Sequence, residues 1–157
     1  MLISAIVLST FAVIWIAVGT RNLGRRWFSS LLSISILISL GVIIAAGKIA
    51  PAHPATFNGK AYGLSVAFEA VLIFLAVFLF RNFERKRFLL PIISIIAGLH
   101  FFGMVWALGS NEYWFVGGAM CLLSILTMSI LPRTVWDSVV GLGCAVILWF
   151  SVICAFF

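Results

Sequence analysis

Six continuous apolar runs, each roughly 20 residues long, occupy almost the whole of this chain of 157 residues. An α-helix needs about 20 apolar residues to cross the hydrocarbon core of a bilayer, at ~1.5 Å per residue. Strands of a membrane barrel are shorter, ~10 residues, and alternate apolar with polar side chains, which these runs do not. The pattern therefore predicts an all-α integral membrane protein, one transmembrane domain over 1–157, with six helices at about 2–19, 27–46, 61–80, 88–108, 114–131 and 134–157.

The composition agrees with lipid as the main solvent of this chain. Hydrophobic residues make up 64% of the sequence and charged residues 9%, whereas a soluble domain has about 25% charged residues. The apolar side chains far exceed what one aqueous core could bury, so we expect the lipid bilayer to be the principal partner of the protein.

The distribution of basic residues predicts the orientation. Eight of the ten Lys and Arg residues follow the first, third and fifth runs: Arg21, Arg25, Arg26, Arg81, Arg85, Lys86, Arg87 and Arg133. Lys48 and Lys60 alone flank the longest loop, Gly47–Lys60. Short loops with excess positive charge face the cytoplasm, so both termini and this long loop are expected on the non-cytoplasmic side. We expect such a chain in a bacterial cytoplasmic membrane, the cell inner membrane.

The motif content argues against several classes of function. Cys121, Cys144 and Cys154 all fall inside apolar runs and have no metal-ligand spacing, so we predict no metal site and no disulfide. His100 is the one histidine inside a run, whereas a membrane b-type haem needs two, and we expect no cofactor. The basic stretches are too short to follow a phosphate backbone, which excludes nucleic-acid partners. No motif of a soluble catalytic site is present, so we name no catalytic residue and favour a protein that is not an enzyme.

Two ionisable residues lie deep inside apolar runs. Glu69 interrupts the third run, and His100 lies inside the fourth. Each is about 12 Å from the outer end of its run at the rise of an α-helix. Because a short turn joins the two runs, we predict that they are antiparallel neighbours with Glu69 and His100 at one depth. A carboxylate at the bilayer centre costs at least ~2.5–3.5 kcal/mol, so Glu69 needs a partner or a proton.

The neighbours of this pair complete the candidate site. Tyr62 and Ser65 share the helical face of Glu69, and Trp106 lies about one and a half turns beyond His100, where it could line an outward-facing cavity. His53, between two prolines of the long loop, could recognise an anionic ligand. We predict ligand or proton binding at these residues. The alternatives are structural: the Glu69–His100 pair only fastens two helices, Trp106 belongs to an interfacial belt, and His53 is an ordinary loop histidine.

Three classes of function fit these observations. The first is a small transport protein or channel component with a proton-handling site between the third and fourth helices, open to the outer side, binding a small molecule or ion and forming a homo-oligomer. The second is a non-catalytic membrane subunit or scaffold, which holds a partner membrane subunit through an exposed patch of small residues, Gly117, Gly118, Gly141 and Gly143. The third is an intramembrane lipid-modifying enzyme with Glu69 and His100 as acid and base. We favour the first class.

Overall fold

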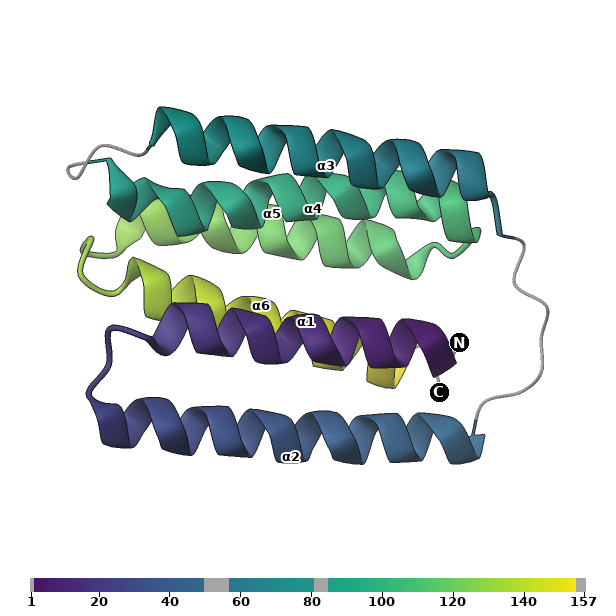
Figure 1. The fold of residues 1–157 in the computed structure, drawn as a ribbon, viewed down its shortest axis with the longest axis horizontal. Helices are drawn as coiled ribbons and strands as arrows, with labels where there is room; N and C mark the ends of the chain where they lie inside the picture. The colour runs from purple at the N-terminus through teal and green to yellow at the C-terminus, as the bar shows by residue number, and fades with distance from the viewer. Residues whose placement is uncertain (1, 50–56, 81–84, 155–157) are drawn as a thin grey trace. The chain divides into compact units, whose positions relative to one another are not determined.

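The computed structural model describes residues 2–49, 57–80 and 85–154, and all regular structure in this part of the chain is helical (Figure 1). Six α-helices and one 3₁₀ turn follow one another: α1 Leu2–Thr20, α2 Arg25–Ile49, α3 Gly59–Leu79, η1 Lys86–Phe88, α4 Leu89–Leu108, α5 Glu112–Ile130 and α6 Trp136–Cys154. Helices α2 to α6 are long and apolar enough to cross a membrane by length and composition, and the corresponding stretch of α1, Ala5–Thr20, is shorter. The all-helical prediction is confirmed for the described residues.

The helix ends differ from the predicted ones by a few residues. The second helix begins at Arg25 and continues through Lys48, and the third begins at Gly59, so the predicted loop Gly47–Lys60 loses residues at both ends. Each added stretch contains Lys or Arg, and both are good helix formers, so a helix can extend past its apolar run.

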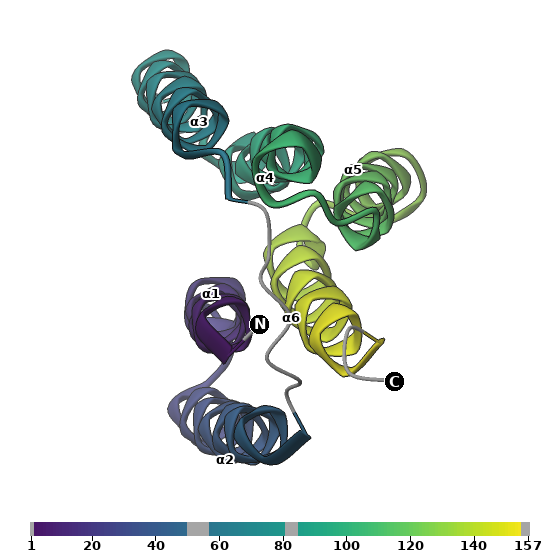
Figure 2. The same ribbon diagram turned by 90° about the vertical axis from the view of Figure 1, so that its right-hand side faces the viewer.

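The described helices form two compact units. The first unit contains α1, α2 and α6, and the second contains α3, α4 and α5. In the second unit α4 lies between α3 and α5 and packs against both, as Figure 2 shows. Phe101 of α4 stacks on Tyr113 of α5 with ring centroids 6.0 Å apart, and both rings are buried. Gly98 and Gly117 face each other across the same pair of helices, where either Cβ would collide with the other helix.

The first unit is held by a close helix crossing and a three-helix hydrogen-bond chain. A Cβ built on Gly141 of α6 would lie 2.6 Å from the Cα atom of Gly19 of α1, so the two backbones touch. On another face, Trp149 Nε1 of α6 donates to Ser39 Oγ of α2 (3.0 Å), and Ser39 Oγ donates to the carbonyl oxygen of Ser9 in α1 (3.1 Å). Small residues and shared polar groups are the usual means of joining membrane helices, because lipid provides little hydrophobic drive for their association.

Polar caps fix the ends of α3 and α4 that lie beside each other. Asn58 caps α3, with its side-chain oxygen accepting a hydrogen bond from the Ala61 amide (3.2 Å). The Asn58 amide in turn donates to the carbonyl oxygen of Ala107, near the end of α4 (2.8 Å). Gly109 ends α4 in the left-handed conformation, with φ of 65°, which a residue without Cβ adopts without strain. These contacts set the register in which α3 runs antiparallel to α4.

Candidate functional site

The candidate site lies at the middle of the α3–α4 helix pair. Glu69 is the central residue of α3, Gly59–Leu79, and is therefore about 15 Å from either end of the helix. His100 lies at a similar distance from the ends of α4, Leu89–Leu108. Glu69 is thus slightly deeper in its helix than the sequence suggested, because α3 begins earlier than its apolar run, whereas His100 is about 12 Å from Leu108, as predicted.

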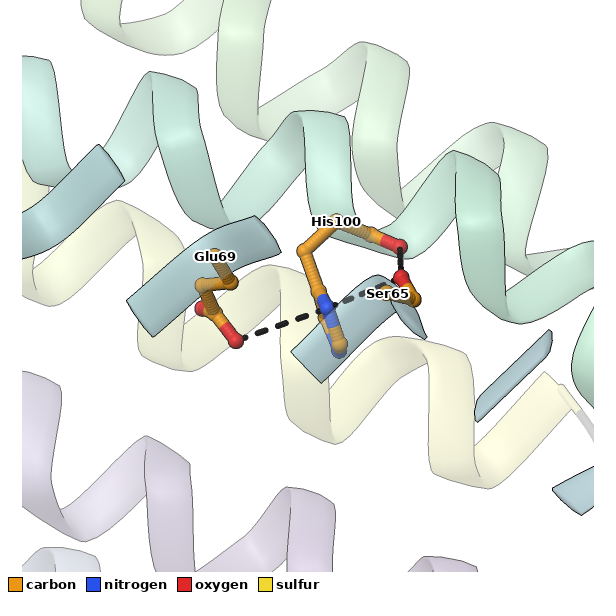
Figure 3. Close-up of polar contacts among 3 residues, drawn as sticks. All are labelled: Ser65, Glu69 and His100. Atoms are coloured by element: carbon orange, nitrogen blue, oxygen red, sulfur yellow. Dashed lines mark hydrogen bonds and ion pairs between the residues drawn. The ribbon is translucent and has the colours of Figure 1, made fainter. Parts of the chain in front are cut away.

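Glu69 and His100 contact each other directly, as Figure 3 shows: His100 Nδ1 lies 3.4 Å from Glu69 Oε2. The imidazole side chain is 11% exposed and the carboxyl side chain 23% exposed. The predicted meeting of the two residues on neighbouring helices is confirmed. Their position along the edge of the seam, half-buried between two helices, leaves part of the carboxyl group accessible.

Ser65, one turn before Glu69 on α3, completes the cluster. Its Oγ atom lies 3.1 Å from His100 Nδ1 and 3.2 Å from the carbonyl oxygen of His100, to which the hydroxyl donates (Figure 3). A serine hydroxyl has one proton, so while it donates to the carbonyl, Oγ can only accept from Nδ1–H. In that state Nδ1–H faces two acceptors, Ser65 Oγ and Glu69 Oε2.

A second arrangement of protons is available at the same heavy-atom positions. If Nδ1 loses its proton, the Ser65 hydroxyl can rotate and donate to Nδ1 in place of the carbonyl oxygen. Ser65 can therefore satisfy His100 in either tautomer without movement of the helices. Such an arrangement suits a site at which a proton arrives and leaves.

Gly103 makes room for Ser65, which the sequence alone did not reveal. A Cβ on Gly103 of α4 would collide with the Oγ atom of Ser65. Helical periodicity placed Gly103 on the face of His100, but its pairing with Ser65 depends on the register between the two helices. A small residue one turn after a deep histidine was the feature of the sequence that could have indicated this pairing.

The other predicted site residues do not join this cluster. Tyr62 is 38% exposed, and its ring packs against Phe57 with centroids 5.6 Å apart. Trp106 is 75% exposed, which places its ring on the outside of α4 and agrees with an interfacial belt more than with a cavity wall. His53 lies outside the described residues.

The small-residue patch expected for partner helices is wrong in two of its members. Gly117 and Gly141 are buried, each within its own unit, and serve the internal contacts with Gly98 and Gly19. Gly118 has open space around its Cα atom. Successive positions of an α-helix lie about 100° apart around its axis. The sequence does not say which of two adjacent glycines faces a neighbouring helix.

Within the described ranges, no three His, Cys, Asp or Glu side chains gather as a metal site would require. The chain matches no known family, no characterised protein and no solved structure.

Proposed function

We propose that this protein is a small multipass transport protein of a cytoplasmic membrane, in which Glu69 and His100 bind and release a proton. All six helices cross the bilayer, both termini lie on the outer side, and the basic turns lie in the cytoplasm, as the distribution of Lys and Arg favours. The observation that carries the proposal is the 3.4 Å contact between an acid and an imidazole at the centre of two helices of membrane length. Ionisable side chains at such depth are costly and mark proton or substrate pathways.

The polar side chains of α3 favour access from the outer side. Tyr62 and Ser65 lie between Glu69 and the Gly59 end of the helix, and Asn58 caps that end, which the charge distribution assigns to the outer side. Beyond Glu69 the seam continues with apolar residues, ending at the buried Ala76. A proton would thus reach Glu69 past Ser65, and His100 would hold it beside the carboxyl group.

A proton-flux assay tests this proposal without knowledge of a transported substrate. The purified protein is reconstituted into liposomes that contain a pH-sensitive dye, and a pH gradient is imposed with the membrane potential clamped. We expect proton flux above that of protein-free liposomes, and its loss in Glu69→Gln. Glu112→Gln is the matched control, because Glu112 is exposed at the start of α5 and the substitution is the same.

Infrared difference spectra supply a second measurement. The carboxylic C=O band of Glu69 should appear and disappear with pH in the wild-type protein and be absent from Glu69→Gln, with Glu112→Gln unchanged. Wild-type flux in Glu69→Gln, together with no titrating carboxyl band, would refute proton handling at this site.

A membrane subunit that supports partner helices is the second candidate, and the surface of α3 favours it. Leu64, Phe74 and Phe78 are 75%, 74% and 64% exposed, and Ala76 is the buried residue of this helix. A partner helix could cover this apolar face in place of lipid, with the Glu69–His100 pair as a fastening between α3 and α4. This candidate predicts that Glu69→Gln leaves flux unchanged and lowers stability. The lipid-modifying enzyme finds less support, since Ser65 is the one further polar side chain that the described contacts bring to the pair.

A further inference from the structure

A second polar cluster lies in the same unit, at the opposite end of α3 and α4 from the caps formed by Asn58 and Gly109. Here the chain enters α4 through η1, and it leaves α5 through the turn 131–135 (Figure 1). The guanidinium carbon of Arg133 lies 5.4 Å from the ring centroid of Phe88 and 5.9 Å from that of Trp136. One cation is thus placed over two aromatic rings that come from separate segments of the chain.

The aromatic support of Arg133 is itself fixed. Phe88 and Trp136 meet edge to face, with centroids 5.1 Å apart, and Trp136 is 4% exposed. Trp136 Nε1 donates to the carbonyl oxygen of Leu131 (3.0 Å), which holds the indole against the turn. The turn is closed by a hydrogen bond from the Val135 amide to the carbonyl oxygen of Pro132 (3.1 Å), and Arg133 occupies its second position. Backbone and rings together restrict where the guanidinium group can lie.

A cation–π contact uses the charge of the guanidinium group and not its N–H donors. The planar fork of five donors that matches phosphate oxygens therefore stays chemically available. Arg133 is exposed, and Arg85, Lys86 and Arg87 are exposed at the adjoining start of α4. Segments 85–88 and 131–136 carry four basic residues and no acidic one. When the acids next in sequence, Glu84 and Asp137, are included, the net charge of the two segments is still positive. Asp137 accepts a hydrogen bond from Asn22 (3.1 Å).

The position of the cluster favours the phosphate group of a lipid over a phosphate dissolved in water. Leu89 begins and Ile130 ends the membrane-length helices at this point, so Arg133 lies where the hydrocarbon gives way to headgroups. Anionic headgroups concentrate at that level of a bilayer, and basic residues beside membrane helices attract them. We propose that Arg133, supported by Phe88 and Trp136, is the centre of a binding site for the phosphate group of an anionic phospholipid. Arg85, Lys86 and Arg87 add to the attraction, and the site is independent of the Glu69–His100 pair.

Charge-conserving variants separate this site from a merely basic surface. Phosphatidylglycerol is titrated into phosphatidylcholine nanodiscs that contain the protein. The protein is then extracted from the nanodiscs, and the phosphatidylglycerol molecules that stay bound to it are counted by native mass spectrometry. We expect Arg133→Lys to lower phosphatidylglycerol retention about fivefold, because lysine keeps the charge but lacks the planar fork of donors and its stacking on the two rings. Arg26→Lys, the same substitution at an exposed arginine at the start of α2, should leave retention unchanged.

Phe88→Leu changes no charge and should weaken phosphatidylglycerol binding as Arg133→Lys does. Thermal melting of each variant in phosphatidylcholine alone shows whether it is folded. If Phe88→Leu is not folded, the comparison of Arg133→Lys with Arg26→Lys still tests the proposal. Equal retention by the wild type, Arg133→Lys and Arg26→Lys would overturn the proposal in favour of diffuse attraction. Displacement of the lipid by inorganic phosphate, but not by sulfate at equal ionic strength, would overturn it in favour of a soluble phosphate ligand.

Discussion

The crossing of α1 and α6 at Gly19 and Gly141 gives the sharpest test of the packing. In Gly141→Ala the new Cβ would lie 2.6 Å from the Cα atom of Gly19 and 2.6 Å from the carbonyl oxygen of Trp15. Both are backbone atoms, so no side chain can rotate away to make room. The hydrogen bond from Ser138 Oγ to the carbonyl oxygen of Gly19, at 3.3 Å, spans the same crossing and would lengthen with it.

The expected cost follows from these distances. Non-bonded carbon atoms rest at ~3.5–4.0 Å, so the helices must separate by roughly 1 Å at this point. Overpacking of this kind costs about 1–3 kcal/mol. The greater helix propensity of alanine returns up to ~1 kcal/mol. We therefore expect Gly141→Ala to lower the free energy of unfolding by about 0–2 kcal/mol against the wild type, and by about 1–3 kcal/mol against an alanine substitution in open space.

The assay is reversible unfolding by sodium dodecyl sulfate in mixed micelles, followed by circular dichroism. Gly41→Ala is the matched control, because Gly41 belongs to α2 of the same unit and has nothing within 4 Å of an added Cβ. The free energy of unfolding of Gly41→Ala should equal that of the wild type or be slightly higher. Equal stability of the two variants would show that the backbones of α1 and α6 do not touch at Gly141, and the reasoning would fail.

Two further substitutions probe single contacts. Gly103→Ala should push Ser65 away from His100 and shift the ¹⁵N resonances of the imidazole, whereas Gly63→Ala, in open space on α3, should not; identical spectra would contradict the pairing of Gly103 with Ser65. Trp149→Phe removes the donor to Ser39 and should lower the free energy of unfolding by about 0.6–1.5 kcal/mol in the same detergent titration, and no loss would argue against this three-helix link.

The helices of this protein and the contact between Glu69 and His100 could be predicted from the amino-acid sequence alone. Apolar runs of membrane length, separated by Pro, Gly and charged residues, predict each helix to within a few residues at its ends, because an α-helix satisfies its backbone groups within one segment. The same one-dimensional reasoning predicted that Glu69 and His100 meet, because depth depends on residue number and neighbours joined by a short turn run antiparallel.

Which face of each helix meets which neighbour depends on how the folded helices pack. In water a polar face marks the outside of a helix, but in lipid both faces are apolar and this contrast disappears. The sequence therefore could not separate the buried Gly117 from the open Gly118. Nor could it place Phe88 beside Trp136 under Arg133, since those rings come from distant segments. The hydrogen bond of Ser65 with His100 likewise depends on helix rotation and register, which packing alone fixes.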